Sequence, residues 1–121
     1  MADQVMTITP IVKGGILDVA GNANAKAGNA AAGNNFLMPN NGHTFLAVSA
    51  VTGDTITFTA VANKYGRTET LAPVMASGKF CLFGPFPPHL WNNGSGQVIF
   101  KPTAGNVGDK YLAVDMGTFQ P

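Results

Sequence analysis

The stretch Asp54-Thr55-Ile56-Thr57-Phe58-Thr59-Ala60-Val61 decides the fold. Threonines at every second position alternate with Ile56, Phe58 and Ala60, and successive side chains of a β-strand point to opposite faces of the sheet. A strand here buries the isoleucine and the phenylalanine and presents the threonines on the other face. Residues 54–61 are therefore predicted to form a half-buried strand.

The segment just before it, residues 44–51, is apolar on both faces, with the run Phe45-Leu46-Ala47-Val48. A strand without a polar face belongs in the middle of a sheet. Only a short connection around Gly53 separates the two segments, and glycine adopts the positive φ that a tight turn needs. The pair is predicted to form a β-hairpin.

Six more segments have strand composition and are bounded by Gly, Asn, Asp or Pro: residues 5–12, 16–20, 68–74, 79–83, 96–101 and 110–116. About eight short antiparallel strands with turns between them are typical of a β-sandwich or jelly roll. The proline-rich link at residues 84–88 lacks amide donors, so it is predicted to cross between sheets or to run along an edge. The fold class is all-β.

Residues 20–35 consist almost wholly of Ala, Gly and Asn, with the single lysine Lys26. Glycines interrupt any helix, and the segment has little apolar bulk to stabilise an ordered conformation. We expect a flexible loop or, alternatively, a segment that becomes ordered against another subunit. The chain of 121 residues is predicted to be one β domain, residues 1–121, in which residues 1–35 form a possible N-terminal arm and flexible segment.

Charge and composition exclude several classes of function. The seven basic and six acidic residues are spread along the chain, giving a net charge of +1. Direct nucleic-acid binding, which needs a basic patch, is therefore not expected. No apolar run approaches the roughly 20 residues that span a bilayer, and the N-terminus does not resemble a secretory signal. We expect synthesis in the cytoplasm.

The lone Cys81, in an apolar run, is predicted to be a core thiol.

The residues that carry chemistry are few. His43 and His89 are the two histidines, and neither has a Cys or acidic residue at metal-ligand spacing. No serine lies in a Gly-x-Ser-x-Gly motif. The six carboxylates mostly fall at turns and strand ends. We therefore expect no catalytic site, no metal, no cofactor and no enzymatic activity.

Aromatic residues gather between Phe80 and Trp91. In one interpretation, Phe80 and Phe83 belong to the core while Phe86, Leu90 and Trp91 cover one end of the sandwich. In the other, Phe86, Leu90 and Trp91 form an interface, since Trp and Phe supply large contact area. A third possibility is that Trp91, next to Asn92 and Asn93, stacks on a sugar.

Two sequence blocks resemble a group of small virion proteins of tailed bacteriophages. Residues 36–48, Phe-Leu-Met-Pro-Asn-Asn-Gly-His-Thr-Phe-Leu-Ala-Val, resemble the group's P-N-D-G-x-T-F-L-x-V block. Residues 82–87 and 91–98 are similar to its G-P-F-P and F-N…G-x-V block. The resemblance covers about residues 36–114. It departs from the pattern at Asn41, at Trp91 and in the length of the Ala/Gly/Asn segment.

The resemblance implies a β-sandwich or jelly-roll decoration protein of the phage head, with no catalytic residue. The expected function is that of a cement protein, which binds the outer surface of the assembled capsid shell and stabilises it. The expected partners are the major capsid protein and further copies of this chain, with a trimer as the first choice. The alternative is a carbohydrate- or host-receptor-binding module on a head fibre.

Overall fold

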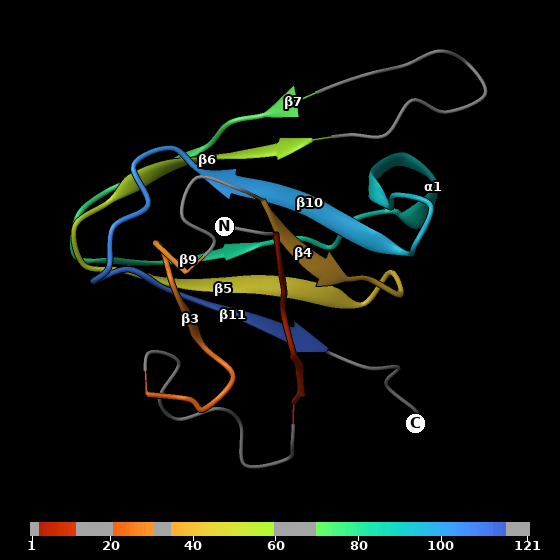
Figure 1. Ribbon diagram of the computed structural model, residues 1–121, viewed down its shortest axis with the longest axis horizontal. Helices are drawn as coiled ribbons and strands as arrows, with labels where there is room; N and C mark the ends of the chain where they lie inside the picture. Colours follow the sequence, from red (N-terminus) through yellow and green to blue (C-terminus); the bar gives the residue numbers. More distant parts are fainter. Residues whose placement is uncertain (1–2, 12–20, 31–34, 60–69, 116–121) are drawn as a thin grey trace.

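The computed structural model describes residues 3–11, 21–30, 35–59 and 70–115. They form two β-sheets that pack as a sandwich (Figure 1), so the predicted all-β fold is confirmed. The first sheet has six strands in the order β1 (Gln4–Val5), β4 (Phe36–Pro39), β10 (Gln97–Pro102), β6 (Asp54–Thr59) and β7 (Thr70–Leu71), with β8 (Val74–Met75) also paired to β6. The second has five, in the order β2 (Ile8–Pro10), β11 (Lys110–Asp115), β5 (Thr44–Ala50) and β9 (Lys79–Phe83), with β3 (Lys26–Ala27) also paired to β11.

The half-buried strand predicted from the threonine alternation is β6. Ile56 and Phe58 are fully buried, and Thr59 is exposed. The all-apolar segment before it is β5, which lies between β11 and β9 inside its sheet, as predicted for a central strand. The alternation in the sequence therefore placed the core face of β6 correctly, and the two apolar faces placed β5 correctly inside its sheet.

The hairpin predicted between these two strands is wrong. β5 pairs with β11 and β9, whereas β6 pairs with β10, β7 and β8, so the connection at residues 51–53 crosses from one sheet to the other. Gly53 does adopt a positive φ of 90°. The Asp109 carboxylate accepts hydrogen bonds from the backbone N–H groups of Thr52 and Gly53, at 2.8 and 3.5 Å. We call residues 51–53 the arch.

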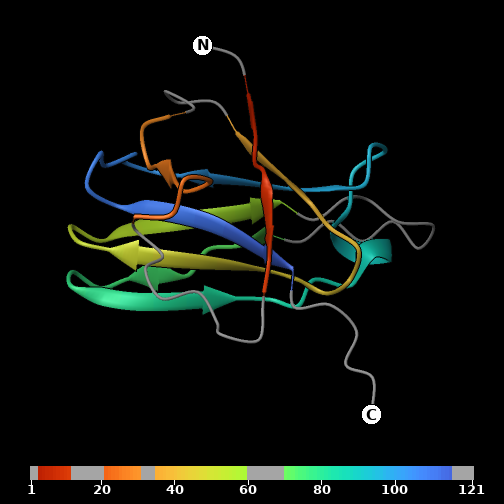
Figure 2. The same cartoon turned by 90° about the horizontal axis from the view of Figure 1, so that it is seen from below.

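The N-terminal strands belong to the sandwich rather than to a separate arm. β1 pairs in parallel with β4 in the first sheet, and β2 pairs in parallel with β11 in the second. Met6, between them, is buried. Figure 2 shows this red chain passing from one sheet towards the other. Because of these two pairings the sheets are mixed rather than purely antiparallel.

Most of the remaining strand predictions are confirmed with shifted ends. Residues 5–12 divide into β1 and β2, and residues 68–74 into β7 and β8. The predicted strand at residues 16–20 lies outside the described residues. β4, which follows the Ala/Gly/Asn segment, was not predicted as a strand because its apolar run is only three residues long before Pro39.

The described part of the Ala/Gly/Asn segment, residues 21–30 and 35, lies against the sandwich. Lys26 and Ala27 pair with β11, and the Gly28 amide donates to the Asp109 carbonyl at 2.9 Å. A Cβ at Gly28 would overlap the Asn106 carbonyl oxygen. Glycine is therefore required where this segment approaches the loop between β10 and β11.

The core is a stack of aromatic rings between the sheets. Phe36, Phe100 and Tyr111 lie with their ring centroids 5.2 to 5.9 Å apart, and all three are fully buried. Phe58 adds contacts to Phe100 and to two rings from the segment that follows β8, those of Phe83 and Phe86. No helix in the described ranges is long and apolar enough to cross a membrane.

The proline-rich link after β9 crosses between the sheets, as predicted. It leads from β9 in the second sheet to α1 (Pro88–Trp91), a single helical turn, and then to β10 in the first sheet. The Gly84 Cα lies close to Phe45, where a side chain would come within 3.2 Å of the ring. α1 and the link therefore close one end of the sandwich.

Candidate functional site

The aromatic residues predicted as an interface lie at the end closed by α1. Phe86 is 3% exposed and its ring lies 5.0 Å from that of Phe58, inside the core. Trp91 is half-buried and packs edge to face on Phe86 at 5.7 Å. The backbone of Leu90 belongs to α1, and its side chain lies outside the described residues. Their interface role stays a prediction, but the described contacts of Phe86 and Trp91 are within the chain.

A pair of asparagines ties this end together. The buried Asn40 side chain donates to the Phe86 carbonyl at 2.8 Å and to Asn92 Oδ1 at 2.7 Å. The Asn92 amide donates back to the Asn40 carbonyl at 2.9 Å. Asn93 Oδ1 accepts from the backbone of Ser95 and Gln97. The asparagines beside Trp91 therefore hold the loops together, which weakens the expectation that they bind a sugar.

The block at residues 36–48 contains the turn between β4 and β5. Asn40 Oδ1 accepts from the Gly42 amide at 3.0 Å, and Asn41 Oδ1 accepts from the His43 amide at 2.8 Å. Such side-chain to backbone bonds replace backbone pairing in a tight turn. Gly42 has φ of 92°. The Asn-Asn-Gly motif is accounted for by the geometry of a turn that joins the two sheets.

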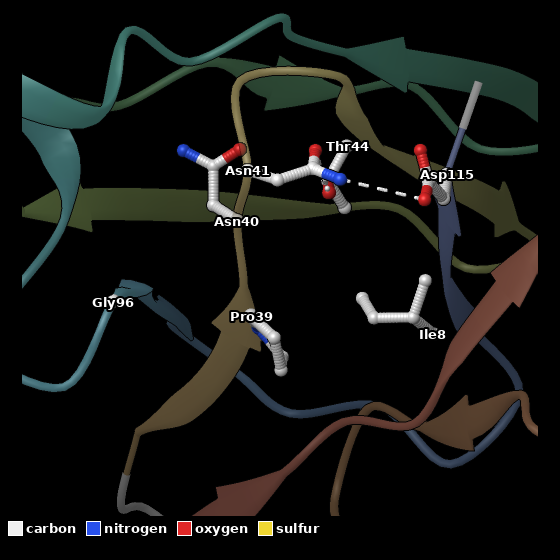
Figure 3. A pocket seen from close by; sticks show the side chains of 7 residues that line it. All are labelled: Ile8, Pro39, Asn40, Asn41, Thr44, Gly96 and Asp115. Atoms are coloured by element: carbon white, nitrogen blue, oxygen red, sulfur yellow. Dashed lines mark hydrogen bonds between the residues drawn. The ribbon is translucent and has the colours of Figure 1, made fainter. Parts of the chain in front are cut away.

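An open cleft of about 370 Å³ lies beside this turn, where the space between the sheets reaches the surface. Figure 3 shows its lining side chains, which come from strands of both sheets and from the turn. The described lining residues are Ile8, Pro39, Asn40, Asn41, Thr44, Gly96 and Asp115. Asn41 Nδ2 donates to Asp115 Oδ2 at 3.4 Å, the dashed line in Figure 3. Sequence analysis did not identify the cleft, because its residues are far apart in the chain.

The other end of the sandwich contains a buried polar cluster. Asp109 is fully buried, and its Oδ2 has no hydrogen-bond partner among the described residues, nor has the hydroxyl of buried Tyr111. Burial raises the pKa of Tyr111, and the carboxylates of Asp54 and Asp109 and the Cys81 thiol raise it further. Both Asp54 oxygens accept backbone N–H groups of the loop between β10 and β11. The described hydrogen bonds of these carboxylates come from backbone N–H groups.

Candidate catalytic or metal-binding groups do not gather in the described residues. No cluster of three or more His, Cys, Asp or Glu side chains is formed there. His43 is exposed, and the His89 side chain lies outside the described residues. Cys81 is half-buried and packs against the core. The expected absence of a catalytic site stays a prediction.

Strand β9 presents apolar side chains to solvent. Phe80 is 60% exposed and Leu82 is 55% exposed, whereas Cys81 and Phe83, which alternate with them, face the core. Within the described residues β9 pairs only with β5, and Figure 2 shows it as the outermost strand of its sheet. We call Phe80, Leu82 and the backbone of β9 the β9 edge.

The interpretation that placed both Phe80 and Phe83 in the core is wrong for Phe80. The two residues are three positions apart, so in a strand they face opposite sides. Phe83 contacts Phe58 at 5.4 Å between ring centroids, which turns Phe80 outward. The sequence did not reveal this because β9 is apolar on both faces, a pattern that usually indicates a buried strand.

Comparisons of the chain with protein-family models, with curated proteins and with solved structures give no match.

Proposed function

We propose that this chain is a structural virion protein that decorates the outer surface of a tailed-phage head and stabilises the assembled shell. The observation that carries the proposal is the β9 edge. Monomeric proteins commonly protect edge strands with charges, prolines or covering segments, whereas β9 exposes Phe80 and Leu82 and has one charged residue, Lys79. An exposed apolar patch on an edge strand is typical of a protein-binding surface.

The phage-like blocks and the low charge add independent support. The blocks at residues 36–48, 82–87 and 91–98 supply β4, most of β5, the end of β9 and the start of β10, so the resemblance concerns the centre of the fold rather than one loop. Charged residues make up 11% of the chain, against about 25% in typical soluble domains. A surface with few charges suits a protein largely covered by neighbouring subunits.

In this proposal the partners are the major capsid protein and further copies of the chain, with a trimer as the preferred assembly. Symmetric positions on a shell favour a symmetric oligomer. Binding only the assembled shell stabilises that state by mass action. The protein would be made in the host cytoplasm and act on the virion without catalysis or a cofactor.

The test uses expanded phage capsids that lack the protein. Purified wild-type protein is expected to bind them and to raise their resistance to heat and osmotic shock. The double variant Phe80→Thr/Leu82→Thr places β-branched residues, which favour strands, in β9. It is expected to bind at least about tenfold more weakly, equivalent to 1.4 kcal/mol. The matched control is Val107→Thr, which changes an exposed apolar residue outside the β9 edge; Val107 is 65% exposed. This control is expected to bind as the wild type does.

Two results would overturn the proposal. One is capsids that are equally robust with and without the protein. The other is equal binding by the β9-edge variant and the wild type, which would remove the surface on which the proposal rests. If free glycans block the attachment of phage particles to host cells through this protein, the alternative of a receptor-binding module on a head fibre is favoured.

A further inference from the structure

We infer that Asn93, in the loop between α1 and β10, is a site of spontaneous deamidation, at which the backbone nitrogen of Gly94 attacks the side-chain amide. The inference does not rest on the function proposed above. The sequence Asn-Asn-Gly occurs twice, at residues 40–42 and 92–94. Asparagine is a chemically labile residue, and a following glycine favours the reaction because it has no Cβ to hinder its nitrogen. The two sites are identical in local sequence, but they differ in their hydrogen bonds.

The reaction is intramolecular, and its rate depends on how freely the nitrogen reaches the carbon that it attacks. A hydroxide ion takes the Gly94 amide proton, and the nitrogen forms a bond to Asn93 Cγ, which places a negative charge on Oδ1. The bond from Cγ to Nδ2 then breaks, Nδ2 takes a proton from water, and ammonia leaves. Water opens the resulting succinimide at either of its carbonyl groups. The products are aspartate and isoaspartate, in which the main chain runs through Cγ.

The Gly94 amide is open to the first step of this reaction. Gly94 is exposed, and no atom beyond its chain neighbours lies within 4 Å of the position that its Cβ would occupy. Its N–H has no hydrogen-bond acceptor among the described residues. The amide proton is therefore accessible to hydroxide, and no partner holds the nitrogen away from the Asn93 side chain.

The Asn93 side chain is held with its oxygen where the reaction develops charge. Oδ1 accepts the backbone N–H groups of Ser95, at 2.9 Å, and of Gln97, at 3.1 Å. Donors fixed in this way stabilise the negative oxygen of a tetrahedral intermediate, as in an oxyanion hole. The leaving amide has a longer contact, since Asn93 Nδ2 donates to Gln97 Oε1 at 3.4 Å. The loop therefore activates the carbon that Gly94 attacks.

Asn41 differs from Asn93 at the attacking nitrogen. Its Oδ1 likewise accepts a backbone N–H group, that of His43 at 2.8 Å. The Gly42 N–H, however, donates to Asn40 Oδ1 at 3.0 Å. Asn40 is buried, and its side-chain amide makes two further hydrogen bonds. Attack on Asn41 would first have to break the bond between Gly42 and Asn40, so this site is protected.

Deamidation of Asn93 changes the end of the sandwich closed by α1. Aspartate keeps an oxygen acceptor for Ser95 and Gln97 but adds a negative charge close to Trp91, which cancels the formal net charge of +1. Isoaspartate lengthens the main chain where the Asn93 N–H donates to the Gln97 carbonyl at 2.8 Å. The isoaspartate form is therefore expected to disturb the loop more than the aspartate form does.

The experiment compares the two sites within one chain by peptide mass spectrometry after incubation at mildly alkaline pH. Trypsin places them on different peptides, because Lys64 and Lys79 lie between them. In the folded protein Asn93 is expected to deamidate at least about tenfold faster than Asn41, equivalent to 1.4 kcal/mol of activation free energy. In concentrated urea the two rates are expected to be similar, because both sites then have only their shared Asn-Asn-Gly sequence.

Gly94→Ala is the matched variant, because a Cβ at this position meets no atom beyond the chain neighbours. It is expected to slow deamidation of Asn93 about tenfold or more and to leave the rate at Asn41 unchanged. Equal rates at Asn93 and Asn41 in the folded protein would overturn the inference. Modification of neither site under conditions that modify both in urea would overturn it as well. If Gly94→Ala does not fold, the comparison of folded and unfolded wild type decides.

Discussion

At the scale of single residues, the most informative side chain is Tyr111. Its ring stacks on Phe36 and Phe100 in the core, while its hydroxyl is buried without a hydrogen-bond partner among the described residues. A buried unpaired hydroxyl costs stability, because the group has lost its contacts with water. The ring of Tyr111 therefore stabilises the folded state, whereas its hydroxyl destabilises the folded state.

Tyr111→Phe is expected to be neutral or to raise the free energy of unfolding by up to about 1 kcal/mol at pH 7. The raised pKa of Tyr111 means that the folded protein keeps this proton at pH values where the unfolded chain loses it. Stability from this group is therefore complete below pH about 10, the ordinary tyrosine pKa, and falls by about 1.4 kcal/mol per pH unit above it.

Urea unfolding of the wild type and Tyr111→Phe between pH 7 and 11 measures this difference. The stability of the variant relative to the wild type is expected to be constant up to pH about 10 and to rise above it. A difference that stays constant across the whole range would contradict the assignment.

At the scale of elements, the arch at residues 51–53 determines that this is a sandwich rather than a meander. Asp109 binds its N–H groups, and Asn106 Nδ2 donates to the Gly53 carbonyl at 2.9 Å. The Ser77 hydroxyl donates to the Val51 carbonyl at 2.9 Å. These partners are distant in sequence. They satisfy backbone groups that a hairpin would pair with one another.

Asp109→Ala is expected to lower the free energy of unfolding by about 1 to 3 kcal/mol, because it leaves the partly buried N–H groups of Thr52 and Gly53 without an acceptor. Asp109→Asn keeps an acceptor oxygen in the same position and is expected to cost clearly less. Chemical denaturation of both variants provides the measurement. Equal losses would show that the negative charge of Asp109, rather than its hydrogen bonds, holds the arch.

At the scale of the whole molecule, the described part of the Ala/Gly/Asn segment is attached to the sandwich by small contacts. Ala25 packs on an outer cluster of Ala47, Leu112 and Val114, and Asn24 donates to Thr9 Oγ1 at 2.8 Å. A covering made of such small side chains buries little apolar area. This is where binding to a shell would change the exchange of backbone hydrogens most.

Hydrogen exchange of the free protein is expected to be faster in residues 20–35 than in β5 and β11, because the Ala, Gly and Asn side chains of this segment offer little apolar bulk to bury. On decorated capsids the same segment is expected to become protected, as in folding upon binding. Mass spectrometry of both states provides the comparison, with β5 and β11 as internal references. Fast exchange of the whole segment in both states would show that it takes no part in binding.

The sequence by itself determined the fold class and the core faces of individual strands. The alternation in β6 placed Ile56 and Phe58 inside, and the two apolar faces of β5 placed it within a sheet, because side-chain period and burial are local properties of a strand. The proline-rich link was likewise predicted to cross between sheets, since prolines cannot donate to a ladder.

Only the tertiary structure decided which strands pair and which surfaces remain open. A short connection with a positive-φ glycine serves a hairpin and an arch equally well, and Asp109, distant in sequence, selects the arch. A strand that is apolar on both faces can be central, as β5 is, or an exposed edge, as β9 is. The cleft joins Ile8, Asn41 and Asp115. Their proximity depends on strand pairing over long sequence separations, which no local pattern encodes.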